Sequence, residues 1–146
     1  MNREEILKMS AGREMDLLIC EHVMQIKARC TSTEYIGREV VGKTYAAIIN
    51  HEEVEMPYYS TDIASAWNVV GKKEIDGWSC VVENLRGVWQ CTFAKVGNTG
   101  AYCTAKFAPL AICQAALLTV VPVTEGGGLT KRAADASPQS PLKNES

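Results

Sequence analysis

The sequence predicts an α+β domain in which an antiparallel meander sheet of about four strands is sandwiched by helices, an α-β-α arrangement. Three segments between residues 78 and 107 alternate apolar and polar side chains and are joined by short turns, which favours antiparallel neighbours. Three other segments carry apolar residues at helical spacing. Because apolar residues occur on both sides of the predicted strands, we expect helices to cover both faces of the sheet.

The amino-terminal part of the chain is predicted to be helical. Residues 3–9 allow a short helical turn, which Gly12 ends. Between residues 13 and 26 the apolar side chains form one helical stripe, namely Met15, Leu18, Ile19, Val23 and Ile26.

The next part of the chain is predicted to hold one strand. Residues 28–39 show little periodicity and predict a loop. Residues 40–50 are rich in β-branched and aromatic side chains and predict a strand centred on residues 44–49. The acidic stretch 51–55 is expected to be an exposed connection, and Pro57 biases the preceding residue away from helix.

A second helix is predicted to begin near Thr61. Ser60 or Thr61 would accept hydrogen bonds from the first turn, where Asp62 also suits the positive end of the helix dipole. Gly71 and the two lysines after it are expected to end the helix. The expected buried stripe consists of Ile63, Ala66, Trp67 and Val70.

The remaining elements are three strands and a third helix. Strands over residues 78–83, 88–96 and 101–107 would place Cys80, Cys91 and Cys103 on adjoining strands. A well-buried helix is predicted over residues 109–120, because proline is favoured in the first helical turn. Residues 1–123 are thus expected to form the domain, and the Gly-, Pro- and Ser-containing residues 124–146 a flexible tail.

Charge and hydropathy exclude several classes of function. The formal net charge of −2 and the pI of about 5.7 argue against binding of nucleic acid through a bulk basic field. We find no secretory signal at the amino terminus and no apolar run suited to crossing a bilayer, so we expect no membrane partner and a cytoplasmic location. In the cytoplasm we expect the cysteines to be reduced thiols.

The cysteines and histidines form no recognisable motif. None of the six cysteines belongs to a C-x-x-C pair, and His22 and His51 are isolated. The simplest interpretation is that the thiols are buried as small apolar groups. We therefore expect no metal and no cofactor. A site of Cys30, His51 and acids such as Glu52 or Glu53, or a cysteine nucleophile with a histidine base, remains as an alternative.

Three stretches resemble one known family. Residues 1–24, which contain MNREEILKM, GREMDLLI and VM, are similar to the opening of small phage and prophage proteins of the ABA-sandwich type. PYYSTDIASAWNVV at residues 57–70 resembles their second signature, and APLAICQAALL at residues 108–118 their closing helix. The resemblance implies an α-β-α sandwich encoded among phage accessory genes, without established catalytic residues. Residues 28–56 and the residues after 123 lie outside it, and we expect function to vary there.

The sequence offers one candidate ligand-binding patch. Tyr58 and Tyr59 stand with Ser60 and Thr61 at a predicted helix start, where aromatic faces and the free N–H groups of the helix start suit an anionic or ring-bearing ligand. The alternative is that Tyr59 packs against the helix as a hydrophobic staple. Cationic partners for such a ligand would be Arg38 and Lys43.

These observations favour a binding protein over an enzyme. We expect a non-catalytic phage accessory protein that binds a host protein, with inhibition of host defence as one such role. Capture of a small anionic or nucleotide ligand is the second hypothesis, and a small enzyme with a Cys/His or metal site the third. A homo-oligomer that pairs through residues 44–49 as an edge strand is also open.

Overall fold

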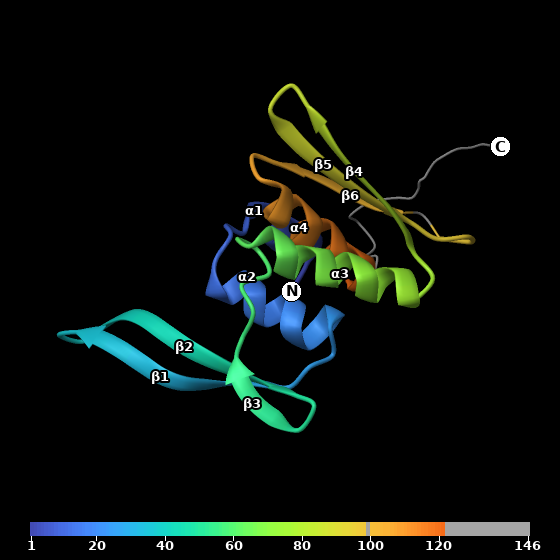
Figure 1. The fold of residues 1–146 in the computed structure, drawn as a ribbon. Coiled ribbons are helices and arrows are strands. Elements are labelled where there is room, and N and C mark those ends of the chain that lie inside the picture. Colours follow the sequence, from blue (N-terminus) through green and yellow to red (C-terminus); the bar gives the residue numbers. More distant parts are fainter. Residues whose placement is uncertain (99, 122–146) are drawn as a thin grey trace.

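The computed structural model describes residues 1–98 and 100–121 (Figure 1). The expected tail, residues 124–146, lies outside the described residues. The elements follow in the order α1 (Arg3–Lys8), α2 (Arg13–Leu18), the π-helical turn η1 (Ile19–Val23), β1 (Ala28–Ile36), β2 (Glu39–Ile49), β3 (Glu52–Glu55), α3 (Ile63–Ile75), β4 (Ser79–Leu85), β5 (Val88–Ala94), β6 (Ala101–Ala105) and α4 (Ala108–Val120).

The strands form two antiparallel sheets with the helices between them (Figure 1). Their orders are β1-β2-β3 and β4-β5-β6. The α+β class is therefore confirmed, and so is the meander of the last three strands. The expected fourth strand, however, belongs to a separate sheet instead of extending the meander.

The layers also differ from the expected arrangement. Helix α4 packs on β5 and β6, and α3 packs on α4 and β4, so one face of the β4–β6 sheet is covered. The other face is open, with Val81 at 55% and Tyr102 at 58% exposure. Apolar residues on this open face, such as Val81, are the reason why the sequence predicted helices on both faces of the sheet.

Helices α1 and α2 follow the sequence prediction closely. Asn2 caps α1 by accepting a hydrogen bond from the backbone N–H of Glu5, whose side chain accepts from Asn2 in return. Met15, Ile19 and Val23 are buried as expected. The helical segment ends at Val23 rather than near residue 26, because Gln25 adopts a left-handed backbone conformation with φ of 59°.

Strand β1 corrects the prediction of a loop over residues 28–39. It pairs with β2 along almost its whole length, although the ladder skips Thr31 on β1 and Val41 on β2. These two interruptions are β-bulges, which bend and twist a strand pair. No buried face imposes a period of two on β1, since its residues are exposed or half-buried.

Two further expectations for this sheet were wrong. Residues 52–55 of the expected connection form strand β3, which pairs with the end of β2. Because β2 therefore lies between β1 and β3, residues 44–49 are not an edge strand available for pairing between subunits.

Helix α3 begins and ends later than predicted. Its N-cap is Asp62, and it continues through Gly71 to Ile75. Ala66 and Val70 are buried as expected, but Ile63 and Trp67 are 44% and 50% exposed. The buried stripe instead consists of Ala66, Val69, Val70 and Lys73. The Lys73 ammonium lies 5.0 Å from the centre of the Trp78 ring, so this buried cation makes a cation–π contact.

Many of the buried residues lie between α4 and the β4–β6 sheet. Cys91, Phe93 and Cys103 from the sheet are at most 2% exposed. Helix α4 matches the predicted helix and buries most of its circumference. Helix α4 also packs on α1, η1 and α3, which joins the other helices to this core.

Candidate functional site

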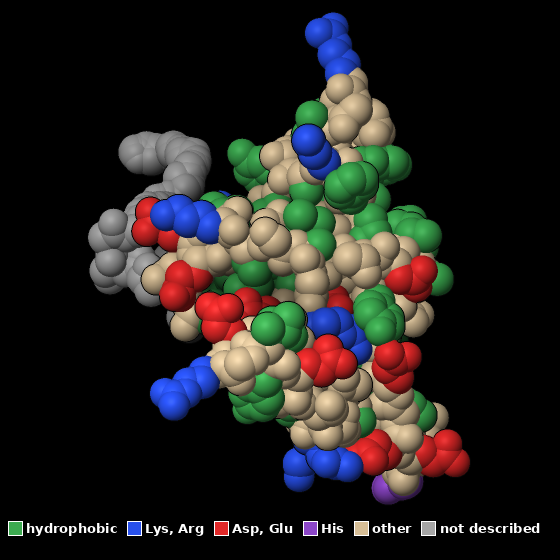
Figure 2. Space-filling view, turned by 90° about the vertical axis from the view of Figure 1, so that its left-hand side faces the viewer, with side chains coloured by type: hydrophobic (Ala, Val, Ile, Leu, Met, Phe, Trp, Pro, Cys, Tyr) green, Lys and Arg blue, Asp and Glu red, His purple; other side chains and the backbone are tan. Residues whose placement is uncertain are grey.

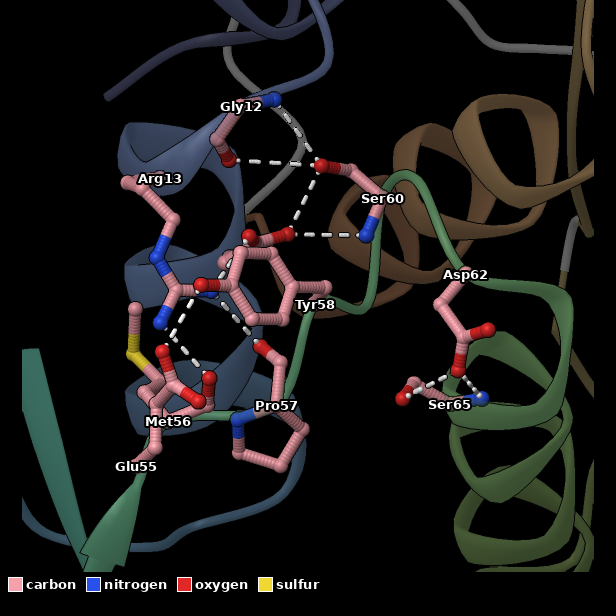
Figure 3. Close-up of polar contacts among 10 residues, drawn as sticks. Gly12, Arg13, Glu55, Met56, Pro57, Tyr58, Ser60, Asp62 and Ser65 are labelled. Carbon is pink, nitrogen blue, oxygen red and sulfur yellow. Dashed lines mark hydrogen bonds and ion pairs between the residues drawn. The ribbon is translucent and has the colours of Figure 1, made fainter.

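The predicted ligand patch lies in the loop between β3 and α3, next to a buried polar cluster on α2 (Figure 3). Asp16 is fully buried. Its Oδ1 accepts hydrogen bonds from the backbone N–H of Ser60 at 2.8 Å and from the Ser60 hydroxyl at 2.7 Å. Ser60 Oγ in turn accepts from the backbone N–H of Gly12 at 2.9 Å. The side chain expected to cap α3 therefore fastens the loop to α2.

Arg13 completes this cluster from the solvent side. Its Nη1 donates to Asp16 Oδ2 at 2.9 Å and to the Pro57 carbonyl at 3.1 Å, while Nη2 donates to the Met56 carbonyl at 2.6 Å. The guanidinium also stacks 3.9 Å from the centre of the Tyr58 ring. One cation thus neutralises the buried carboxylate and holds the loop backbone at the same time.

The two tyrosines of the patch have different environments. Tyr58 is 44% exposed, and its hydroxyl donates to Glu55 Oε2 at 2.8 Å, which raises the pKa of Tyr58. Tyr59 points into the core and is 1% exposed. Burial beside the Cys20 thiol raises the pKa of Tyr59, and burial raises the pKa of Cys20 to about 11. Tyr59 is therefore a packing residue. It belongs to the main hydrophobic core and not only to a local staple at the start of α3.

The amino terminus of α3 already holds a carboxylate. Asp62 Oδ2 accepts from the backbone N–H of Ser65 at 3.0 Å and from its hydroxyl at 2.8 Å (Figure 3). Thr61 is exposed beside it. An anion approaching this helix start meets the Asp62 carboxylate first, which weakens the electrostatic case for the predicted patch.

The structure does not bring the two predicted cations to this patch. Arg38 lies in the turn between β1 and β2, and Lys43 lies on β2 opposite Thr33. Among the described residues, no hydrogen bond or ion pair joins either side chain to the loop at residues 57–61. Of the six residues proposed from the sequence, Tyr59 and Ser60 are therefore buried, Tyr58 and Thr61 are exposed beside α3, and Arg38 and Lys43 lie on the β1–β2 hairpin.

The hairpin that carries Arg38 presents an apolar surface of its own, which the sequence reading missed. It projects away from the helices (Figure 1). Large apolar side chains at its end are exposed, and we call them the hairpin tip: Tyr35 (62%), Ile36 (71%), Val40 (51%) and Val41 (52%). Tyr35 and Val40 are direct cross-strand partners, and Val41 is the bulged residue beside them. The missed signal was a run of β-branched and aromatic residues on both sides of Gly37.

The residues weighed as a metal or Cys/His site are scattered. His22 and His51 are exposed, and Glu53 pairs with Arg29. The Cys30 sulfur lies 3.4 Å from the Ser32 carbonyl and 3.6 Å from Thr33 Oγ1, both on its own strand. Within residues 1–98 and 100–121, no group of three or more His, Cys, Asp or Glu residues is arranged to hold a metal ion. Nor does any helix in these ranges have the length and apolar character needed to cross a membrane.

Comparison with known proteins gives one match. The family described as Phage ABA sandwich domain matches residues 17–117. The match runs through residues 28–56, which the resemblance noted from the sequence had left out. Neither the curated proteins nor the solved structures contain a match to the chain.

Proposed function

Because this chain belongs to the Phage ABA sandwich domain family, we propose that it is a phage- or prophage-encoded accessory protein that binds a host protein through the hairpin tip. Binding would take place in the cytoplasm of the infected or lysogenic host, and one consequence would be inhibition of a host defence protein.

The observation that carries the proposal is the exposure of the hairpin tip. Its four apolar side chains are each more than half exposed, and they lie close together on both sides of the turn between β1 and β2. Clusters of exposed apolar side chains mark interaction sites more often than isolated ones do. The tip is not part of the hydrophobic core, so core packing gives no reason for these residues to be apolar.

Charge and topology indicate the kind of partner. Acidic and basic side chains are interspersed with hydrophobic ones on the side of the molecule toward which the hairpin points (Figure 2). Around the tip lie Glu34, Arg38, Glu39 and Lys43, two of each sign. A polar rim of mixed charge around an apolar centre suits a protein surface better than a nucleic acid. Strand β1 is also an edge strand, so a partner segment can extend the sheet there.

Capture of a small anionic ligand at Tyr58 and Thr61 is less well supported. The Arg13 guanidinium and the Tyr58 hydroxyl are engaged within the protein, and Glu55 and Asp62 add negative charge. The enzymatic hypothesis has no arrangement of a nucleophile and a base in the described residues to support it.

The experiment compares matched variants in the two sheets. Tyr35→Ser with Val40→Thr removes apolar surface from the hairpin tip. Tyr102→Ser with Val81→Thr makes the same changes at similar exposure on the open face of the β4–β6 sheet. Wild-type protein is first used to capture partners from host lysate, and the affinity of each variant for the captured partner is then measured.

We expect the hairpin variant to bind the partner at least tenfold more weakly and the control variant to bind as the wild type does, because apolar anchors dominate interface energy. Equal binding by wild type and hairpin variant would overturn the placement. A loss confined to the control variant would move the interface to the open sheet face.

A further inference from the structure

The inner face of the β4–β6 sheet gathers cysteine thiols. Cys91 on β5 is the direct ladder partner of Cys103 on β6. Cys80 on β4 is the partner of Phe93, which places it diagonally across from Cys91. The Cys80 and Cys91 sulfurs are 3.8 Å apart. Cys113, on the helix that covers this face, is fully buried. All of these cysteines are free thiols.

We propose that Cys80 and Cys91 are a redox pair that a hydroperoxide converts to an intramolecular disulfide. The pair is an oxidative modification site on the inner face of the β4–β6 sheet, and the inference does not depend on the proposed function of the hairpin.

The surroundings assign different roles to the two sulfurs. Cys80 is half-buried on an edge strand, whereas Cys91 is completely buried. Donation of a hydrogen bond by the Cys91 thiol lowers the pKa of Cys80, and the same contact together with burial raises the pKa of Cys91. Cys80 is therefore the thiol that an oxidant reaches and that ionises first, and Cys91 is the thiol that resolves the product.

The chemistry balances with two thiols and one hydroperoxide. The Cys80 thiolate attacks the terminal peroxide oxygen, so that an S–O bond forms, the O–O bond breaks, and the alcohol or water leaves with the thiol proton. The Cys91 sulfur then attacks the Cys80 sulfur. An S–S bond forms, the S–O bond breaks, and water leaves with the Cys91 proton. The two thiols lose two electrons, and the peroxide gains them.

The strand geometry allows the second step. A disulfide requires the sulfurs to approach by about 1.8 Å from their present separation. Strand β4 is bonded in the sheet only to β5, so it can shift toward β5 without breaking another ladder. Among the described residues, Cys80 and Cys91 are the two thiols found in hydrogen-bonding contact with each other. Cys103 lies on the far side of Cys91, 2% exposed, and burial raises its pKa to about 11.

The test uses the full chain, reduced and then exposed to hydrogen peroxide. Intact mass and peptide mapping after alkylation show which thiols are lost and which peptides are joined. We expect a joined pair of peptides that contain Cys80 and Cys91. Cys80→Ser should abolish this joined pair, whereas Cys30→Ser and Cys103→Ser should leave it unchanged. Circular dichroism checks that each variant is folded.

A second measurement keeps the inference testable if the disulfide is short-lived. In Cys91→Ala, the sulfenic acid on Cys80 has no resolving thiol, so a dimedone probe should label Cys80 at least tenfold more than it does in wild type. Joining of any other cysteine pair would overturn the proposal. So would oxidation of Cys80 no faster than that of the exposed Cys30, or equal dimedone labelling in wild type and Cys91→Ala.

Discussion

The two sheets of this protein share a topology and differ in what covers them. Both are three-stranded antiparallel meanders. One face of the β4–β6 sheet is covered by α4, and Cys91 and Phe93 are fully buried there. The β1–β3 sheet is buried only at its base, where Tyr45, Ala46 and Ala47 meet the helices. Local pairing alone therefore does not determine whether a strand belongs to the core.

The difference divides the molecule into a packed half, which consists of the β4–β6 sheet and α4, and a projecting half, which is the β1–β3 sheet (Figure 1). Residues of the packed half are constrained by volume, because a close-packed interior tolerates little change in size. The end of the hairpin is constrained only by backbone pairing and its two bulges, so its side chains are free to serve recognition. Substitutions that compare the two halves test this division directly.

The largest expected effect is on the packed half. Phe93→Ala should lower the free energy of unfolding by about 3–5 kcal/mol, because Phe93 is completely buried and its truncation leaves a cavity. Urea denaturation followed by circular dichroism measures the change. Val40→Ala in the hairpin is the comparison, and a similar loss in both variants would contradict the division.

The next effect concerns the contact that joins α2 to the loop between β3 and α3. Asp16→Ala leaves the buried N–H of Ser60 without its acceptor and the Arg13 guanidinium without its carboxylate partner, and should cost roughly 2–4 kcal/mol. Asp16→Asn keeps the shape and one acceptor oxygen, so it should cost less. Thermal unfolding of both variants provides the measurement. An Asn variant as unstable as the Ala variant would mean that charge, not hydrogen bonding, holds the loop.

The buried thiols make the folded protein sensitive to alkaline pH. Burial raises the pKa of Cys20 and Cys103 to about 11, above the value of about 8.5 in an unfolded chain. The unfolded state therefore loses protons first. Stability from these groups is complete below pH ~8.5 and falls as the pH rises toward 11, by up to about 1.4 kcal/mol per unit and group.

Urea denaturation between pH 7 and 11, in the presence of a phosphine reductant, measures how the free energy of unfolding falls with pH. Cys103→Ala should show a shallower decline than wild type, whatever its stability at pH 7. An unchanged slope would mean that Cys103 is not buried in the protonated form.

The same comparison explains which parts of the fold were readable from the sequence. Strand β5 was predicted because it has one buried side, which imposes a period of two on its residues. Helix α4 was predicted because Pro109 suits the first helical turn and apolar residues cover most of its circumference. Strand β1 was missed because neither of its faces is buried. Trp67 was placed in the buried stripe of α3 by its helical spacing, yet half of its surface is exposed.

The candidate surfaces were less predictable, because they depend on contacts between distant residues. Ser60 was expected to cap α3, but 44 residues separate it from its true partner, Asp16. Local patterns carry no information about such a pair. Tyr58 and Arg38 were grouped as one patch on chemical grounds alone, and the fold assigns them to different surfaces.

A smaller effect is expected at the exposed cap of α3. Asp62→Ala removes the acceptor of the Ser65 N–H at the start of α3 and should cost about 1 kcal/mol. Asp62→Ser keeps a capping oxygen and should recover most of that loss. The midpoint of thermal unfolding reports both changes, and a loss equal to that of Phe93→Ala would show that the cap also holds the loop before α3.

The smallest effect on stability is expected at the hairpin tip. Tyr35→Ser removes a side chain that is 62% exposed, and should change the free energy of unfolding by no more than about 0.5 kcal/mol. Tyr102→Ser is its counterpart on the other sheet and should be similarly mild, because Tyr102 also lies on an uncovered face. Urea denaturation of the two variants side by side tests this equality. A cost near 2 kcal/mol for Tyr35→Ser alone would mean that the tip packs against other residues of the chain, which would remove the reason for assigning it to a partner.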